Sequence, residues 1–323
     1  MQDWILPALS IGSRVAPDAA GRVHSVYRQA CNVELDTGAL LTLLCAALGN
    51  LPHGIRFTLP EPQDLRVRLR PGQAVVRDGS RLRIAQAGVT IELSHAAPWR
   101  CELAACDVYA RPAVQAMLAA LAALREHALR GGFAPLVLND AEPAAPLEQA
   151  MRRRLLDCLP LLGSAAASLD AALVMQALER LAGLGPGLTP SGDDFIVGYL
   201  ASLHSRSQLE SVLQPFLNGL TAPLARLAAA SNPISRQFIL NAVDCEFAEA
   251  LTQLVAAIAA HDQQRAREAA ERVASVGHSS GCDSLLGLLF GLCPSLVLGP
   301  APSLSPGAVR HGTHHAGESI ATT

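Results

Sequence analysis

The sequence is poor in charged and aromatic side chains, and this scarcity excludes several classes of protein. Charged residues make up 16% of its 323 positions, aromatic residues make up 4%, and the net charge is −3. Nucleic-acid-binding proteins typically carry a basic patch or a run of basic residues interleaved with aromatic ones. No such run occurs in this chain. We therefore expect no nucleic-acid partner.

Long uninterrupted apolar stretches are missing as well. A membrane-spanning helix needs about 20 consecutive apolar residues, and Arg, Glu, Asp or Pro interrupts each apolar stretch before that length. The first residues, Met1 to Trp4, lack the basic region and apolar core of a signal peptide. These absences predict no membrane partner and a cytoplasmic location.

The eight cysteines do not form a Cys-x-x-Cys motif. In a cytoplasmic chain most such cysteines are small buried hydrophobic residues. Cys282 differs because it lies in a glycine-rich loop before a predicted helix, where the pKa of a thiol can fall. A nucleophilic role for Cys282 is the alternative to burial, and His278 is the one general base that the sequence places beside it.

Hydrophobic residues make up half of the chain, enough to bury one large core or two ordinary ones. Up to about residue 108, short alternating apolar runs are separated by Asp-Gly and Pro-Gly turns, a pattern typical of strands. We predict an α+β protein with an N-terminal antiparallel β barrel or sandwich-like domain over residues 1–108. The predicted strands cover 21–27, 31–35, 39–45, 54–59, 74–77, 82–84 and 88–93.

From residue 110 the pattern changes to long segments rich in Ala and Leu, which favour helix. A larger all-helical domain is therefore predicted over 109–298. Residues 299–323 are rich in Pro, Ser, Gly and Thr, and we predict a disordered tail there. The predicted helices, eight to ten in all, cover 111–129, 147–162, 169–181, 194–204, 208–218, 222–230, 234–243, 246–260 and 262–276.

Two glycine-rich loops precede helices 89 positions apart. The first is Gly183-Leu-Gly-Pro-Gly-Leu-Thr-Pro-Ser-Gly-Asp-Asp-Phe195, and the second is Gly277-His-Ser-Ser-Gly-Cys-Asp283. Ser, Gly and Asp recur at matching positions, which predicts two equivalent helix starts. The unpaired N–H groups of a helix start make it a candidate anion site. The alternative is a pair of capping boxes with Ser191 and Ser280 as N-caps.

Two pairs of glycines are not explained by capping boxes. Gly192 and Gly281 weaken a first helical turn, and Gly198 and Gly287 cost roughly 0.5–1 kcal/mol each in a helix interior. Close approach of a ligand at the first pair, and of another backbone at the second, would explain both. We therefore expect the loops to converge on one pocket and the helices to cross at Gly198 and Gly287.

A third segment, Ser231-Asn-Pro-Ile-Ser-Arg-Gln-Phe238, lies between the two loops. Ser231 or Asn232 can cap a helix whose first position is Pro233, and Arg236 then falls about one turn inside. The carboxylates of the loops need a cation nearby, and a planar guanidinium suits carboxylate or phosphate. We expect Arg236 to face the same cavity; the alternative is a structural ion pair.

Four segments together resemble one family: 183–195, 234–240, 277–283 and Arg-Val-His-Ser-Val-Tyr at 22–27. The chain is similar to the AllH-like family, whose name comes from a subunit of oxamate carbamoyltransferase. The resemblance implies carbamoyl transfer between carbamoyl phosphate and oxamate in anaerobic allantoin (purine) breakdown, alongside two other protein subunits. Cys282 stands where this family has a bulkier residue, often aromatic.

The residues of these segments suit that chemistry. The substrates present anionic oxygens for N–H groups and Arg236, and amide N–H groups for carboxylates. Backbone donors at Gly192 or Gly281 would stabilise the developing oxyanion, by about 2.7–4 kcal/mol each. The candidate catalytic residues are Asp194, Asp283 and His278. The candidate substrate-binding residues are His24, Gly187, Thr189, Ser191, Gly192, Asp193, Arg236, Ser279, Ser280 and Gly281.

Two other functions remain open at this point. The chain can be a non-catalytic subunit that binds a small acid or phosphate and assembles with partners. It can also be a Mg²⁺-dependent enzyme on a phosphorylated small molecule, with Asp193, Asp194 and Asp283 near the ion, since Mg²⁺ takes one or two carboxylates together with phosphate oxygens. The sequence assigns no other cofactor.

Overall fold

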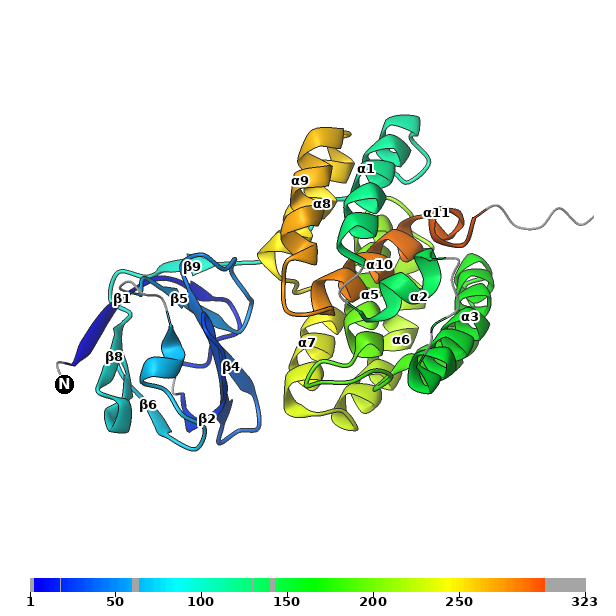
Figure 1. The fold of residues 1–323 in the computed structure, drawn as a ribbon. Coiled ribbons are helices and arrows are strands. Elements are labelled where there is room, and N and C mark those ends of the chain that lie inside the picture. The colour runs from blue at the N-terminus through cyan, green and yellow to red at the C-terminus, as the bar shows by residue number, and fades with distance from the viewer. Residues whose placement is uncertain are drawn as a thin grey trace, which may run out of the picture.

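The computed structural model describes residues 3–17, 19–59, 64–128, 131–139, 143 and 145–299. A β domain is followed by a larger helical domain, and the two lie side by side (Figure 1). The predicted α+β class is therefore confirmed. Apart from Gly299, the predicted tail lies outside the described residues.

The β domain is a closed barrel in which the sheet order is β5-β4-β3-β2-β6-β7-β8-β1, with β5 paired to β1. β9 extends the sheet beyond β1. The interior is apolar because alternate residues of each strand point inward. The strands are β1 (Trp4–Gly12), β2 (Ala20–Val26), β3 (Ala30–Leu35), β4 (Leu40–Cys45), β5 (Gly54–Phe57), β6 (Ala74–Asp78), β7 (Arg81–Ile84), β8 (Val89–Glu92) and β9 (Ala97–Trp99).

Strand β1 closes the barrel and was not predicted. Its Leu6, Ala8 and Ser10 are buried, so it has the alternation of a half-buried strand despite Pro7. Strand β1 lies between β8 and β5. It runs parallel to β8 and antiparallel to β5. The pairs β1–β9 and β4–β5 are also parallel, so the barrel has mixed rather than purely antiparallel pairing.

The helical domain packs around one large apolar core. Two predicted helices are a single helix, α6, which continues through Pro223. The short helices α2 and α11 were not predicted. The helices are α1 (Arg111–His127), α2 (Phe133–Leu138), α3 (Pro146–Ala167), α4 (Ala171–Leu181), α5 (Ser191–Ser207), α6 (Leu213–Ala229), α7 (Pro233–Val243), α8 (Glu249–Ala259), α9 (Gln263–Ala274), α10 (Ser280–Leu292) and α11 (Pro294–Leu298).

The sequence repeat is part of a larger structural repeat, in which α4–loop–α5 corresponds to α9–loop–α10. Asp170 caps α4 and Asp262 caps α9, and each side chain accepts a backbone N–H bond of 3.0 Å. The residue before each cap, Leu169 or His261, has a positive φ of 57° or 61°. The repeat therefore includes the entry into the first helix as well as the glycine loop.

Helices α5 and α10 cross in the centre of the helical domain (Figure 1). A Cβ atom on Gly198 would overlap the carbonyl oxygen of Ser284, and a Cβ atom on Gly287 would overlap that of Phe195. These contacts are reciprocal under the repeat, since Phe195 and Ser284 occupy equivalent positions. The predicted glycine crossing is confirmed, and it brings the two helix starts together.

The barrel contacts the helical domain mainly through α7 and the start of α8. Glu249 accepts hydrogen bonds from the backbone N–H and the side-chain amide of Asn50, both 2.8 Å long. Buried His53 contacts Asn241, with 2.7 Å between Nδ1 and Nδ2. A cleft lies between the two domains, and Asn50 is among the residues that line it.

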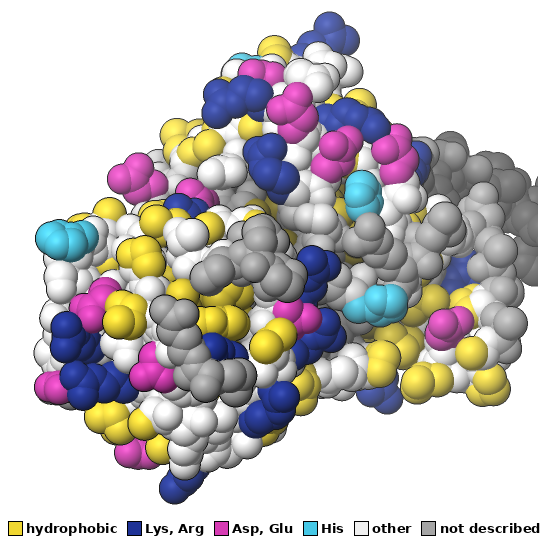
Figure 2. Space-filling view, turned by 60° about the vertical axis from the view of Figure 1, so that its left-hand side comes forward, with side chains coloured by type: hydrophobic (Ala, Val, Ile, Leu, Met, Phe, Trp, Pro, Cys, Tyr) yellow, Lys and Arg dark blue, Asp and Glu magenta, His cyan; other side chains and the backbone are white. Residues whose placement is uncertain are grey.

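The outer surface carries mixed charge. Acidic and basic side chains are interleaved on the face shown in Figure 2, with hydrophobic side chains between them. Within the described part of the chain, no helix has the length and apolarity needed to cross a membrane.

Candidate functional site

A cleft of about 1630 Å³ lies between the barrel and the helical domain. Leu44, Leu48 and Leu51 line it from the barrel, and Phe238, Phe247 and Leu251 are among the residues of the opposite wall. Its volume exceeds the roughly 300–1,000 Å³ of a typical small-ligand site. Most of the wall is apolar, so the few polar groups that face the cleft mark the candidate site.

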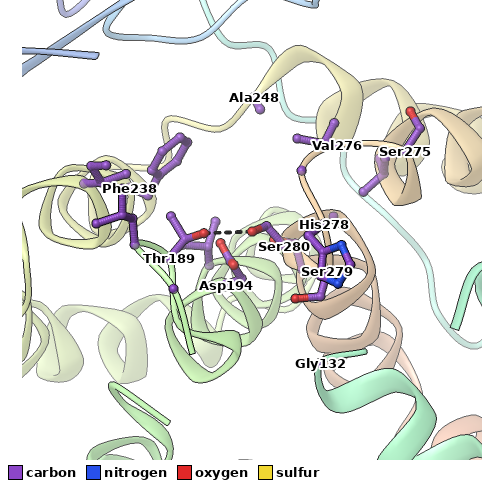
Figure 3. Close-up of a pocket in the computed structure, with 18 of the residues that line it drawn as sticks. Gly132, Thr189, Asp194, Phe238, Ala248, Ser275, Val276, His278, Ser279 and Ser280 are labelled. Atoms are coloured by element: carbon purple, nitrogen blue, oxygen red, sulfur yellow. Dashed lines mark hydrogen bonds between the residues drawn. The ribbon is translucent and has the colours of Figure 1, made fainter. Parts of the chain in front are cut away.

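Both glycine loops reach this cleft, as the sequence predicted. The first loop contributes Gly187, Leu188 and Thr189, and the second contributes residues 277–281. The hydroxyl groups of Thr189 and Ser280 lie 2.7 Å apart and hydrogen-bond across the gap between the loops (Figure 3). This tertiary contact links the two helix starts directly, which local capping within each helix would not do.

The capping-box interpretation is wrong. Ser191 and Ser280 are the first helical residues, and the N-cap positions belong to Pro190 and Ser279. Neither helix start has a side-chain capping hydrogen bond. The Ser280 hydroxyl is directed across to the other loop instead.

Gly192 and Gly281 serve packing within each loop. A Cβ atom on Gly192 would overlap the carbonyl of Leu181, and one on Gly281 would overlap that of Val273. Their amides donate to Leu184 O at 2.9 Å and to Val276 O at 3.1 Å. Gly281 lines the cleft and Gly192 does not. The expected oxyanion role of these two amides is therefore wrong, because both are already bonded.

Asp194 is the carboxyl group that faces the cleft at the glycine loops, between Thr189 and Ser280 (Figure 3). This residue is 8% exposed, and its Oδ2 atom has no hydrogen-bond partner among the residues that the structure describes. Burial raises the pKa of Asp194 well above its usual range, and the neighbouring Asp283 raises it further. The hydroxyls of Ser280 and Thr189 act in the opposite direction.

Asp283, at the equivalent position of the second repeat, is fully buried and does not line the cleft. Its Oδ1 atom accepts a 2.6 Å hydrogen bond from the backbone N–H of Phe133. Burial raises the pKa of Asp283 to about 7, while the Phe133 amide and the hydroxyls of Ser191 and Ser279 oppose the increase. Ser191 thus lies beside Asp283 and away from the cleft lining.

Asp193 faces away from the cleft and joins the first glycine loop to the segment before α7. It accepts bonds from the Gly183 N–H at 2.8 Å and from the Ser231 hydroxyl at 2.9 Å. The three carboxylates considered for Mg²⁺ therefore do not gather at one point. No group of three or more His, Cys, Asp or Glu side chains suited to a metal ion occurs among the residues that the structure describes.

Arg236 and His24 also lie outside the cleft lining. Arg236 donates to the carbonyl of Gly38 in the barrel at 3.1 Å, so its guanidinium helps to join the domains. His24 lies where the β2–β3 pairing shifts register between Val23 and Ser25. The expectation that Arg236 and His24 face the ligand site is wrong for this geometry.

His278 and Ser279 line the cleft beside Gly132 (Figure 3). The chain contains no lysine, and the basic side chains among the described lining residues are Arg28 and His278. Sequence reasoning missed Arg28, Gly132 and Phe133. The Gly131–Gly132 pair, which follows the predicted helix over 111–129, is the sequence signal that could have indicated this segment.

Cys282 is fully buried and does not line the cleft. Its sulfur lies 3.7 Å from the carbonyl oxygen of Ala274 and 3.9 Å from that of His127. This placement fits the structural interpretation of Cys282 and gives its thiol no access to a ligand in the cleft.

Comparison with known families agrees with this division of the chain. A family model for oxamate carbamoyltransferase subunit AllH matches residues 181–292, a range that contains both glycine loops. A second model, for the AllH family N-terminal domain, matches residues 7–98 and so covers most of the barrel. No solved structure matches the chain. The two family matches together span most of the sequence, and the chain belongs to the AllH family.

Proposed function

We propose that this chain is the subunit of an oxamate carbamoyltransferase that binds the small carbamoyl-bearing substrates, and that the cleft is the binding site. The observation that carries the proposal is the meeting of the two glycine loops beside the unpartnered, buried Oδ2 atom of Asp194. A buried polar atom without a partner costs stability unless a ligand or water satisfies it.

The polar groups at the loops suit oxamate, which carries a carboxylate next to a carboxamide. The hydroxyls of Thr189, Ser279 and Ser280 can donate to carboxylate oxygens or accept from an amide N–H group. In the transfer reaction the amide nitrogen of oxamate attacks the carbamoyl carbon, the bond to phosphate breaks, and the nitrogen loses a proton. His278 is the exposed base at the cleft that can take this proton.

Partner subunits are part of the proposal. The cleft is larger than a site for oxamate or carbamoyl phosphate requires, and it is open between the two domains. We propose that two other subunits cover it and complete the reaction site, in the cytoplasm and in the pathway of anaerobic allantoin breakdown. Exclusion of water by such a cover would strengthen every polar contact at the loops.

Reconstitution tests the function. The chain is mixed with its two candidate partner subunits, and phosphate release from carbamoyl phosphate is measured with and without oxamate. We expect oxamate-dependent release only when this chain is present. The double variant Thr189→Val/Ser280→Ala should lose at least about tenfold in kcat/KM, the loss that corresponds to about 1.4 kcal/mol of transition-state binding.

The matched control is Thr221→Val, which removes a hydroxyl on α6 that bonds to Leu217 O outside the cleft. It should leave kcat/KM unchanged. Equal activity of the double variant and the control would contradict the assignment of the loops to the substrate. Activity that disappears with EDTA would favour the metal-dependent alternative.

A further inference from the structure

The two equivalent aspartates of the repeat have different surroundings. Beside Asp283, the backbone of Gly132 and Phe133 closes the space. The Phe133 N–H donates to Oδ1, and a Cβ atom on Gly132 would lie 2.5 Å from Oδ1 and 2.6 Å from Oδ2. In the described part of the chain, Oδ2 of each aspartate lacks a hydrogen-bond partner, but of the two side chains only that of Asp194 lines the open cleft.

We propose that Asp283 is a positioning residue that holds the negative charge of the pair, and that Asp194 carries a proton and donates it in a hydrogen bond to an anionic oxygen of the ligand. This inference rests on the proposed function, because that function supplies the ligand, a small carboxylate or phosphate. It reverses the role expected from the sequence, in which Asp194 accepts an amide N–H group.

Electrostatics supports this division. Two buried carboxylates whose charges repel each other do not both ionise readily near neutral pH, and the charge of Asp283 raises the pKa of Asp194. Hydroxyl groups lower the pKa of both aspartates, but Asp283 also accepts the Phe133 N–H, so we place the charge there. Burial raises the pKa of both aspartates, and the charge of Asp283 raises that of Asp194 further.

The other charged groups near Asp194 leave Asp283 as the aspartate that holds the charge. Asp193 on the same helix adds a further carboxylate that raises the pKa of Asp194. His278, in the loop before α10, is exposed to solvent. The remaining charged side chains that line the cleft come from the barrel, α3 and the segment before α8: Arg28, Glu148 and Glu246.

The consequence is a characteristic pH dependence. A protonated Asp194 attracts an anionic oxygen, and an ionised Asp194 repels it. Oxamate keeps its own carboxylate charge throughout, so its affinity should fall as the pH rises through the pKa of Asp194. A single ionisation changes the affinity by at most about tenfold per pH unit.

The test is calorimetric titration of the full-length chain with oxamate at several pH values between about 6 and 9. The wild-type chain should bind more weakly as the pH rises. Asp194→Asn keeps an N–H donor and cannot ionise, so it should bind with little pH dependence. Asp283→Asn removes the charge that opposes ionisation of Asp194, so its loss of affinity should begin at lower pH than in the wild type.

Asp157→Asn is the matched control, because Asp157 is an exposed residue of α3 paired with Arg180. It should reproduce the wild-type pH profile. Affinity that increases with pH in the wild type, or Asp194→Asn and wild-type profiles that coincide, would overturn the inference. Circular dichroism of each variant checks that it is folded.

Infrared difference spectroscopy separates failure of this inference from failure of the proposed function. At about pH 8, above the pKa of about 7 of Asp283, the unliganded wild-type chain should show the C=O stretch of a protonated carboxyl group that Asp194→Asn lacks. Presence of this band without oxamate binding would contradict the proposed ligand and leave the proton on Asp194. A band lost in Asp283→Asn and retained in Asp194→Asn would overturn the assignment of the proton.

Discussion

Asp194 and Asp283 lie at equivalent positions of a repeat, yet one faces the cleft and the other is closed in by Gly132 and Phe133. The sequence predicted that both would belong to the place where the loops meet. It could not predict which one faces the cleft, because Phe133 is 150 residues away from Asp283 in the chain. Arg236 was misplaced for the same reason, since its partner Gly38 is 198 residues away.

The buried residues Asp194 and Asp283 make the free energy of unfolding depend on pH. In the unfolded chain an aspartate has a pKa of about 3.9, and in the folded chain the pKa of Asp283 is about 7. The folded state therefore binds more protons than the unfolded state above about pH 4. The stability contributed by protonated Asp283 is fully present below about pH 4 and is lost as the pH rises through about 7.

The titration of His53 changes stability with pH in the opposite direction. Burial lowers the pKa of His53 from 6.5 to about 3. Between these two values the unfolded chain binds a proton at this histidine and the folded chain does not. That contribution is present above about pH 6.5 and is lost as the pH falls towards 3. The aspartate effect is therefore best isolated above about pH 6.5.

We predict that the free energy of unfolding of the wild type decreases between about pH 6.5 and 8, by at most about 1.4 kcal/mol per pH unit for each proton. Asp283→Asn should show a smaller decrease, because it removes one titrating group and lowers the pKa of its neighbour. Urea unfolding at several pH values measures both slopes. Equal slopes in the two proteins would contradict the burial and coupling of this pair.

At the scale of elements, the two helix starts were predictable because each carries its own local signal of glycine, hydroxyl and carboxylate. The crossing at Gly198 and Gly287 was predictable from the unexplained glycines. Strand β1 was missed because Pro7 interrupts it, and a proline inside a run argues against a central strand. Helix α6 was divided in error after Asn218, because Gly219 follows and Pro223 suits the first turn of a new helix, whereas the observed helix continues through both.

The glycine crossing predicts an unusual response to alanine. Alanine normally stabilises a helix relative to glycine by roughly 0.5–1 kcal/mol, but a Cβ atom on Gly198 would overlap the backbone of Ser284. Gly198→Ala should therefore destabilise the protein by about 1–3 kcal/mol, and Gly198→Leu by at least as much. Gly287→Ala should behave in the same way, and thermal and urea unfolding measure the change.

Gly219 provides the control on α6. A Cβ atom there would lie 3.8 Å from the Cβ of Ala171, an ordinary contact distance. Gly219→Ala should be neutral or stabilising. If Gly198→Ala and Gly219→Ala stabilise the protein equally, the two helices do not touch at Gly198.

At the scale of the whole molecule, the barrel and the helical domain meet through contacts such as Asn50 with Glu249 and His53 with Asn241. The sequence predicted both domains from their different periodicities. It could not predict their mutual placement, because these contacts join residues 188 and 199 positions apart. The cleft and its volume follow from that placement, and so does the exclusion of Arg236 from it.

The most direct test of the central claim is a crystal structure of the full chain grown with saturating oxamate. Density for oxamate should lie between Thr189 and Ser280, with one of its oxygens within hydrogen-bond distance of the Asp194 carboxyl group. Crystals of Asp194→Ala grown under the same conditions should lack this density. Density for oxamate elsewhere in the molecule, or no density for it in the wild-type cleft, would contradict the assignment of the cleft as the substrate site.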